Sequence, residues 1–176
     1  MGMGLTQNQA RDLNVSELFS LVADLNKYTR FSVIPMRGHG NVAGADQVMT
    51  WQTGFPFAVN FGRGFPRYGP GEFTAVDVLA RQEADAALIL ASDPVAHFPW
   101  AAAQYLEKIP TIVLDPMQSL TSQTAKVFLP TAGYGIDAEG TAYRMDGVAI
   151  RLRPVLTRTR PTDEEVLSQI IERLAV

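Results

Sequence analysis

The chain has 176 residues, of which 47% are hydrophobic and 19% are charged, with a net charge of −3 and no cysteine. This composition predicts one folded domain and excludes disulfides, iron–sulfur ligation and thiolate zinc sites within the chain. There is no basic excess for binding nucleic acid and no run of about 20 apolar residues for a membrane span. The first residues lack an export signal, so we expect a cytoplasmic protein.

The first part of the chain predicts a helix, a strand and a second helix. Apolar residues recur at helical spacing over residues 15–27, and Asn14 with Glu17 gives a capping-box pattern at its start. Residues 30–36 are interpreted as a strand and residues 43–53 as a helix. A stretch rich in glycine, proline and aromatic residues follows, and a connection of that length usually has a function or contacts a partner.

From residue 73 onwards, short apolar runs alternate with helical segments. We predict strands at 86–91, 111–115, 126–130 and 148–152, helices at 74–82, 99–108 and 120–125, a glycine-rich loop at 134–148, and a last helix capped at Thr162 and ending at Leu174. Strands that are apolar throughout and alternate with helices indicate a parallel sheet with both faces covered. The predicted fold class is therefore α/β, with a three-layer, Rossmann-like and mostly parallel sheet.

Polar residues follow these strands at the edge where open parallel sheets bind ligands. Ser92 and Asp93 follow one apolar run, and Asp115 ends the next. A carboxylate in this place can accept hydrogen bonds from a ribose or from a guanine edge. Asp-Pro is also an ordinary way to end a strand, and that alternative stays open.

The turn Arg-Gly-His-Gly-Asn at residues 37–41 is a sharper signal. Arg37, between a predicted strand and glycines, offers a rigid donor fork to a carboxylate or phosphate. The alternative is a solvated surface turn. His97 is interpreted as packed at a helix start, and two histidines without cysteine do not make a metal site.

Three segments resemble molybdopterin oxidoreductases of the formate dehydrogenase and dimethyl sulfoxide reductase type. Residues 36–44 resemble their Arg-Gly-x-x-Asn-Val-x-Gly segment, and residues 2–7 resemble their Gly-x-Gly-x-Thr-Gln turn. Residues 127–130 and 139–141 resemble their strand ending in Leu-Pro and the Gly-Thr loop after it. Longer blocks look like one family in particular, the B subunits of formylmethanofuran dehydrogenase: residues 51–56, 63–68, 91–99 and 140–147.

In that family, carbon dioxide is reduced to formate during methanogenesis at a molybdenum or tungsten centre. Two molybdopterin guanine dinucleotides and a cysteine or selenocysteine hold the metal, and a partner subunit joins formate to methanofuran. By resemblance, Arg37 matches the active-site arginine that orients carbon dioxide or formate. The resemblance also implies that one dinucleotide groove is lined by Gly4, Thr6, Ser92, Asp93, Asp115, Glu139, Gly140 and Thr141.

The family's metal-ligand cysteine and its neighbouring histidine have no match in this sequence. We therefore expect residues 1–176 to be a single domain of a larger subunit that neither catalyses nor binds the cofactor alone. Its expected partners are the other formylmethanofuran dehydrogenase subunits, and exposed aromatic residues in 54–72 predict a sticky or homodimeric chain. One alternative is a cofactor-free B-like subunit of a bacterial formyltransferase/hydrolase complex, and another is an unrelated nucleotide-binding domain.

Overall fold

The computed structural model describes residues 3–5, 9–36 and 38–174. The described helices are η1 Met3–Leu5, α1 Arg11–Leu25, α2 Val42–Thr53, α3 Ala75–Ala80, α4 Pro94–His97, α5 Trp100–Leu106, α6 Leu120–Thr124 and α7 Asp163–Leu174. The described strands are β1 Val59–Asn60, β2 Arg67–Tyr68, β3 Ala87–Leu90, β4 Thr111–Asp115, β5 Val127–Pro130, β6 Gly140–Tyr143 and β7 Ala149–Leu152.

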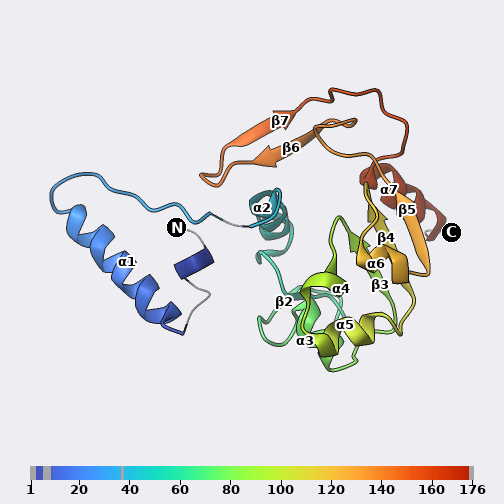
Figure 1. The fold of residues 1–176 in the computed structure, drawn as a ribbon, viewed down its shortest axis with the longest axis horizontal. Helices are drawn as coiled ribbons and strands as arrows, with labels where there is room; N and C mark the ends of the chain where they lie inside the picture. The colour runs from blue at the N-terminus through green and yellow to red at the C-terminus, as the bar shows by residue number, and fades with distance from the viewer. Residues whose placement is uncertain (1–2, 6–8, 37, 175–176) are drawn as a thin grey trace.

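The second half of the chain is built on a parallel sheet. Strands β3, β4 and β5 lie in sequence order, with Ile89 paired to Val113 and Val113 paired to Phe128. Helices α4 and α5 connect the first two strands and α6 connects the last two (Figure 1). The α/β class and these three predicted parallel strands are therefore confirmed.

One face of this sheet is closed by helices. Leu79 of α3 and Ala102 and Leu106 of α5 form a buried cluster, against which Ala87 and Ile89 of β3 pack. Side chains alternate between the two faces of a strand, so these β3 residues share one face. The closed face holds the core of the described chain.

The opposite face stays partly open. Leu88, Ile112 and Val127 are paired side by side across the three strands and are 46%, 37% and 39% exposed. Nearer the carboxyl ends the cover is uneven, since Leu114 is fully buried whereas its β3 partner Leu90 is 40% exposed. The prediction of a sheet covered on both faces is thus wrong for this row as the described residues stand, because no described helix packs over it.

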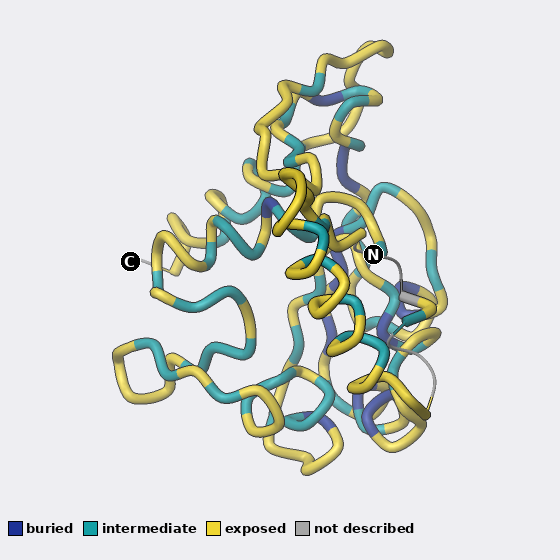
Figure 2. The backbone as a smooth tube through the Cα atoms, turned by 90° about the vertical axis from the view of Figure 1, so that its left-hand side faces the viewer, coloured by how far each residue is buried: buried dark blue, intermediate teal, exposed yellow. Residues whose placement is uncertain are grey.

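The N-terminal helix lies apart from the sheet. Every residue of α1 is exposed or half-buried, and α1 projects from the body beside η1 (Figures 1 and 2). The predicted cap at Asn14 is wrong, since the helix begins at Arg11 and the Asn14 side chain donates to the carbonyl of Leu5 (3.3 Å). Because α1 buries none of its residues, its helical form depends mainly on the helix propensity of its own sequence.

The predicted strand at 30–36 is also wrong. Residues 31–36 are described but form no strand. Strands need a neighbour to satisfy their backbone groups. Here the Asn26 side chain takes the place of a neighbouring strand at one residue. It donates to the carbonyl of Phe31 (2.7 Å) and accepts from the Phe31 amide (3.2 Å).

Two antiparallel hairpins complete the fold. β1 and β2 pair within the 54–72 stretch, where the rings of Phe55 and Tyr68 stack with centroids 5.0 Å apart. β6 and β7 pair across the predicted glycine-rich loop, so a loop over all of 134–148 is wrong. The last helix begins with the predicted capping box, in which Thr162 and Glu165 each accept the other's amide.

Candidate functional site

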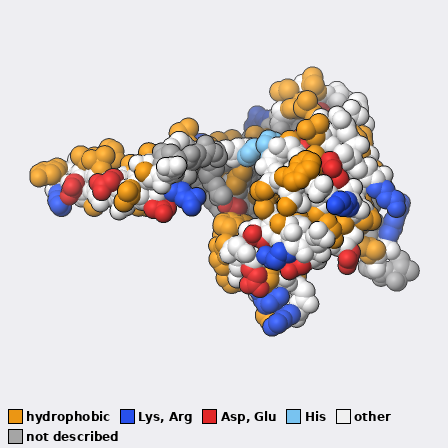
Figure 3. Space-filling view, turned by 60° about the horizontal axis from the view of Figure 1, so that its bottom comes forward, with side chains coloured by type: hydrophobic (Ala, Val, Ile, Leu, Met, Phe, Trp, Pro, Cys, Tyr) orange, Lys and Arg blue, Asp and Glu red, His pale blue; other side chains and the backbone are white. Residues whose placement is uncertain are grey.

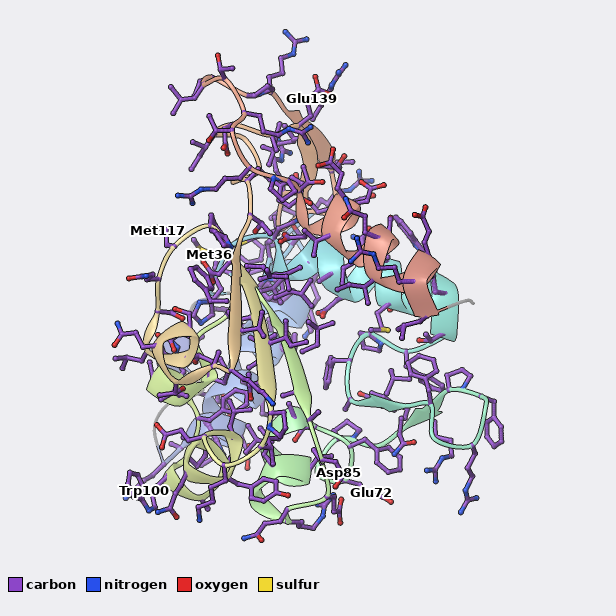
Figure 4. All side chains as sticks on the ribbon, turned by 90° about the vertical axis from the view of Figure 1, so that its right-hand side faces the viewer. Met36, Glu72, Asp85, Trp100, Met117 and Glu139 are labelled. Atoms are coloured by element: carbon purple, nitrogen blue, oxygen red, sulfur yellow. The ribbon has the colours of Figure 1, made fainter. Side chains whose placement is uncertain are left out.

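The carboxyl ends of β3 and β4 bring three predicted site residues together. Ser92 and Asp93 follow β3, and Asp115 ends β4. Ser92 is exposed, whereas Asp115 is half-buried and its Oδ1 accepts the amide of Met117 (2.8 Å). In Figure 4, Met117 and Glu139 lie toward this end of the strands, and Asp85 lies at the other end.

The carboxylate of Asp93 is engaged by the protein. Its Oδ1 accepts from the amide (2.9 Å) and hydroxyl (2.6 Å) of Thr121, and its Oδ2 accepts from the amide of Leu120 (3.2 Å). Burial opposes the ionised form, but these hydrogen bonds outweigh it and lower the pKa of Asp93. Asp93 is therefore a charged link between the loop after β3 and the start of α6.

The turn next to Arg37 touches α4, the helix that follows β3. The ring of His39 meets the ring of His97 edge-on, with centroids 5.8 Å apart. The Nδ1 of His97 lies 2.8 Å from the carbonyl oxygen of Asp93, which fixes the orientation of the ring. Arg37, predicted to be catalytic, lies outside the described residues.

The same turn also holds the β6 strand. The amide side chain of Asn41 donates to the carbonyl of Thr141 (3.0 Å) and accepts from the amide of Tyr143 (2.8 Å). Asn41 has a positive φ of 57°, which asparagine tolerates better than most residues. A Cβ on Gly44 would lie only 2.4 Å from Asn41 Oδ1, so this approach needs a glycine.

A cavity of about 780 Å³ opens between α2, β6 and the end of β3. Its wall includes Thr141, Tyr143 and Tyr134. Burial raises the pKa of Tyr134, and the charge of Asp163 adds to the rise, so the phenol remains a donor at neutral pH. A Cβ on Gly140 would meet the Tyr134 ring at 2.7 Å, which explains a glycine beside this wall.

The remaining predicted site residues are less central. Glu139 is exposed and forms an ion pair with Arg151 (2.7 Å). Gly4 lies in η1, on the α1 side of the molecule and away from the sheet (Figure 1). Thr6 lies outside the described residues.

Two features are absent from the described part of the chain. It contains no group of three or more histidine, aspartate or glutamate side chains arranged to hold a metal ion. None of its helices is both long and apolar enough to cross a membrane. The polar groups at the strand ends are backbone amides and hydroxyls, which can donate hydrogen bonds, and carboxylates, which accept them.

Sequence reasoning gave no role to Asn41, Gly44 or Thr121. A signal for the first two was available, because Asn and Gly stand three residues apart in the Arg-Gly-x-x-Asn-Val-x-Gly motif, at the start of a predicted helix. Thr121 had no signal, since its partner Asp93 is 28 residues away in the chain. Only the fold shows that the two meet.

Comparison with known proteins gives the same family as the motifs. The chain is 49% identical to the B subunit of the tungsten-containing formylmethanofuran dehydrogenase 2 of Methanocaldococcus jannaschii over 174 residues, 98% of this chain and 40% of that protein. It is 42% identical to the protein of the same name from Methanococcus maripaludis, with the same coverage. By sequence, the chain is a homologue of the formylmethanofuran dehydrogenase B subunits. No family model matches it.

A relative of lower identity belongs to a complex with a solved structure. The B subunit of the formyltransferase/hydrolase complex Fhc of Methylorubrum extorquens is 30% identical over 165 residues. The crystal structure of that complex with methylofuran superposes with a TM-score of 0.75, covering 93% of this chain and 45% of the matched chain. The chain thus spans less than half the length of the relatives that it matches.

Proposed function

We propose that the chain forms one wall of a guanine dinucleotide groove in a formylmethanofuran dehydrogenase that reduces carbon dioxide. The groove would run along the carboxyl ends of β3 and β4, between Ser92, Asp115 and the start of β6 at Gly140 and Thr141. Loops at the carboxyl ends of parallel strands are where such sheets bind nucleotides. The three-layer Rossmann-like domain expected for this family would be completed by polypeptide beyond the described residues.

One observation supports this proposal above the others. The turn at 38–41 contacts α4, which follows β3, through His39 and His97, and it contacts β6 through Asn41. Three segments that lie far apart in the sequence, each singled out by its motif, therefore meet at one place. A chance likeness of short motifs would not require their side chains to converge.

The groove offers donors and acceptors that fit a guanine nucleotide. The carboxylate of Asp115 could accept from the guanine edge, and the Ser92 hydroxyl and backbone amides near Gly140 could donate to ribose or phosphate. When bound, the molybdenum or tungsten pterin supplies the electron transfer to carbon dioxide. Arg37, adjacent to the convergent turn, would orient carbon dioxide or formate and stabilise negative charge on its oxygens.

The surface of the chain supports a place within a larger assembly. It exposes 12284 Å², whereas a folded monomer of its mass is expected to expose about 8,400 Å². Hydrophobic side chains are visible on the projecting α1 and over the body (Figure 3). An excess of this size is comparable with the interfaces of permanent complexes, so we propose partner subunits or further family polypeptide as its cover.

A second candidate is a structural B-like subunit that holds no pterin. The likeness to the Fhc structure, with its TM-score of 0.75, favours this alternative. Both candidates place this fold within a complex of several subunits, but they differ at the groove. Only the first needs a guanine-specific site at Asp115.

The two candidates are separated by titrating the chain with GDP, the half of the cofactor that the groove would hold. We expect saturable binding by calorimetry, with ADP bound more weakly. Asp115→Asn should weaken GDP binding at least tenfold, because a hydrogen bond to a charged group contributes roughly 1.5–3 kcal/mol. Asp146→Asn, at an exposed aspartate of the β6–β7 turn, is the matched control and should bind as the unaltered chain does.

A folded chain that shows no saturable GDP binding would contradict the dinucleotide groove and favour the structural role. Equal affinity for GDP and ADP, unchanged in Asp115→Asn, would favour an unspecific phosphate site instead.

A further inference from the structure

A polar clamp joins the two loops that flank the proposed groove. Asp93 accepts three hydrogen bonds, from the hydroxyl and amide of Thr121 and the amide of Leu120. The Thr121 hydroxyl in turn accepts the amide of Val95 (3.0 Å). Thr121 is fully buried, and the bonds of its hydroxyl and amide are partly buried, whereas the bond from Leu120 is exposed.

The clamp spans the space between two strand ends. Ser92 precedes Asp93 on one side, and Asp115 ends β4 five residues before α6 on the other. The amide of Ala91 donates to the carbonyl of Leu114 (2.8 Å), which extends the strand pairing up to the loops. Loops at strand ends are usually the most mobile parts of a domain. Here, they are tied together directly.

The start of α6 already has a local cap without Asp93. Ser119 accepts the amide of Ser122 (3.2 Å), and the Ser122 hydroxyl accepts the amide of Ser119 (2.8 Å). A short helix with its own capping box does not need a second cap from 27 residues away. The added bonds from Asp93 therefore serve mainly to fix one loop against the other.

We infer that Asp93 and Thr121 are positioning residues, which hold Ser92 and Asp115 at the spacing that a guanine nucleotide requires. This inference rests on the proposed function. It assigns Asp93 an indirect part, because both of its oxygens already accept protein donors. Affinity for a ligand that bridges two loops depends on their being held in place before binding.

The test removes the Thr121 hydroxyl while keeping its shape. Thr121→Val abolishes the hydroxyl bond to Asp93 Oδ1 and the bond from the Val95 amide, but it keeps the backbone amide bond to Asp93. Thr121→Ser keeps the hydroxyl and both of its bonds. Thr124→Val is the matched control, since it removes an exposed hydroxyl of the same helix that bonds only within α6. Each variant of the full chain is titrated with GDP by calorimetry, and its folded fraction is measured by urea unfolding.

We expect Thr121→Val to weaken GDP binding about tenfold when fully folded, with Thr121→Ser and Thr124→Val within about twofold of the unaltered chain. If Thr121→Ser binds GDP as the unaltered chain does, the loss in Thr121→Val is due to the missing hydroxyl and not to a change in side-chain volume. If Thr121→Val does not fold, Asp93→Asn decides, and we expect a similar loss from it.

Unchanged GDP affinity in folded Thr121→Val, or in Asp93→Asn where the first does not fold, would overturn the clamp alone. Absence of GDP binding by the unaltered chain would overturn the proposed groove and the clamp with it.

Discussion

The two faces of the parallel sheet are made of the same kinds of residue but differ in how far they are buried. On one face, Ile89 packs against α3 and α5, and its β4 partner Val113 is fully buried. On the other face, Leu88, Ile112 and Val127 form an exposed row in register. Strand composition alone does not tell these faces apart.

This difference shows which face of the sheet the described chain covers with its own helices. Parallel sheets are stable when both faces are covered, because their strands are apolar on both sides. The closed face is covered by helices that lie just before and just after β3 in the sequence. The open face would need polypeptide from elsewhere, which agrees with relatives more than twice as long as this chain.

One kind of substitution made on both sides of the sheet tests this difference most directly. Leu106→Ala in the closed core should lower the free energy of unfolding by roughly 2–5 kcal/mol, through lost burial and the cavity left behind. Leu88→Ala on the open face should cost about 1 kcal/mol or less, because almost half of its surface is already exposed. Urea unfolding of both variants measures the contrast.

Equal losses in the two leucine variants would show that the open row is covered in solution. Self-association of the chain is one way to cover it. Light scattering over a concentration series, run alongside, detects that state, and it also tests the homodimer predicted from the aromatic stretch.

The sequence predicted the secondary structure correctly where the local pattern and the tertiary packing agree. Apolar runs located β3, β4 and β5, and the capping box located the start of α7, because those signals act within a few residues. Residues 30–36 have an equally good strand pattern but lack a partner strand among the described residues. Strand formation depends on such distant pairing, and a local pattern cannot supply it.

A second contrast lies within the Arg-Gly-His-Gly-Asn turn and the helix after it. Gly44→Ala should destabilise the chain by roughly 1–3 kcal/mol, because its Cβ would displace the Asn41 side chain from β6. Gly40→Ala is the matched control, since no atom lies within 4 Å of the position of its Cβ. Urea unfolding should leave Gly40→Ala near the unaltered chain, and a loss as large as that of Gly44→Ala would contradict the role given to Asn41.

The candidate site was predictable as a set of segments but not as a set of contacts. Motif likeness selected residues 37–41, 92–93, 115 and 139–141. It could not show that Asn41 bonds to β6 or that Asp93 reaches Thr121. These contacts join residues 100 and 28 positions apart, and they exist only once the sheet has formed.

The weakest effect that we expect is a difference in pH dependence between a half-buried carboxylate, Asp93, and an exposed one. The pKa of Asp93 is lowered in the folded chain, so its charge contributes stability above the ordinary value of about 3.9. That contribution is lost as the pH falls from this value through the lowered folded pKa. Asp93→Asn removes the carboxylate, so its unfolding free energy between pH 7 and pH 3 should fall less steeply than that of the unaltered chain.

Asp146 provides the exposed counterpart for this measurement. Its hydrogen bond with Arg144 lowers its pKa to about 2, a large shift, but the pair lies in solvent. Exposed pairs are screened and cost side-chain entropy, so Asp146→Asn should give a pH curve parallel to that of the unaltered chain. The partial burial of the bonds between Thr121 and Asp93, and not the size of the pKa shift, then decides which carboxylate contributes more to stability. A steeper dependence on Asp146 than on Asp93 would reverse that order and make the clamp the weaker of the two contacts.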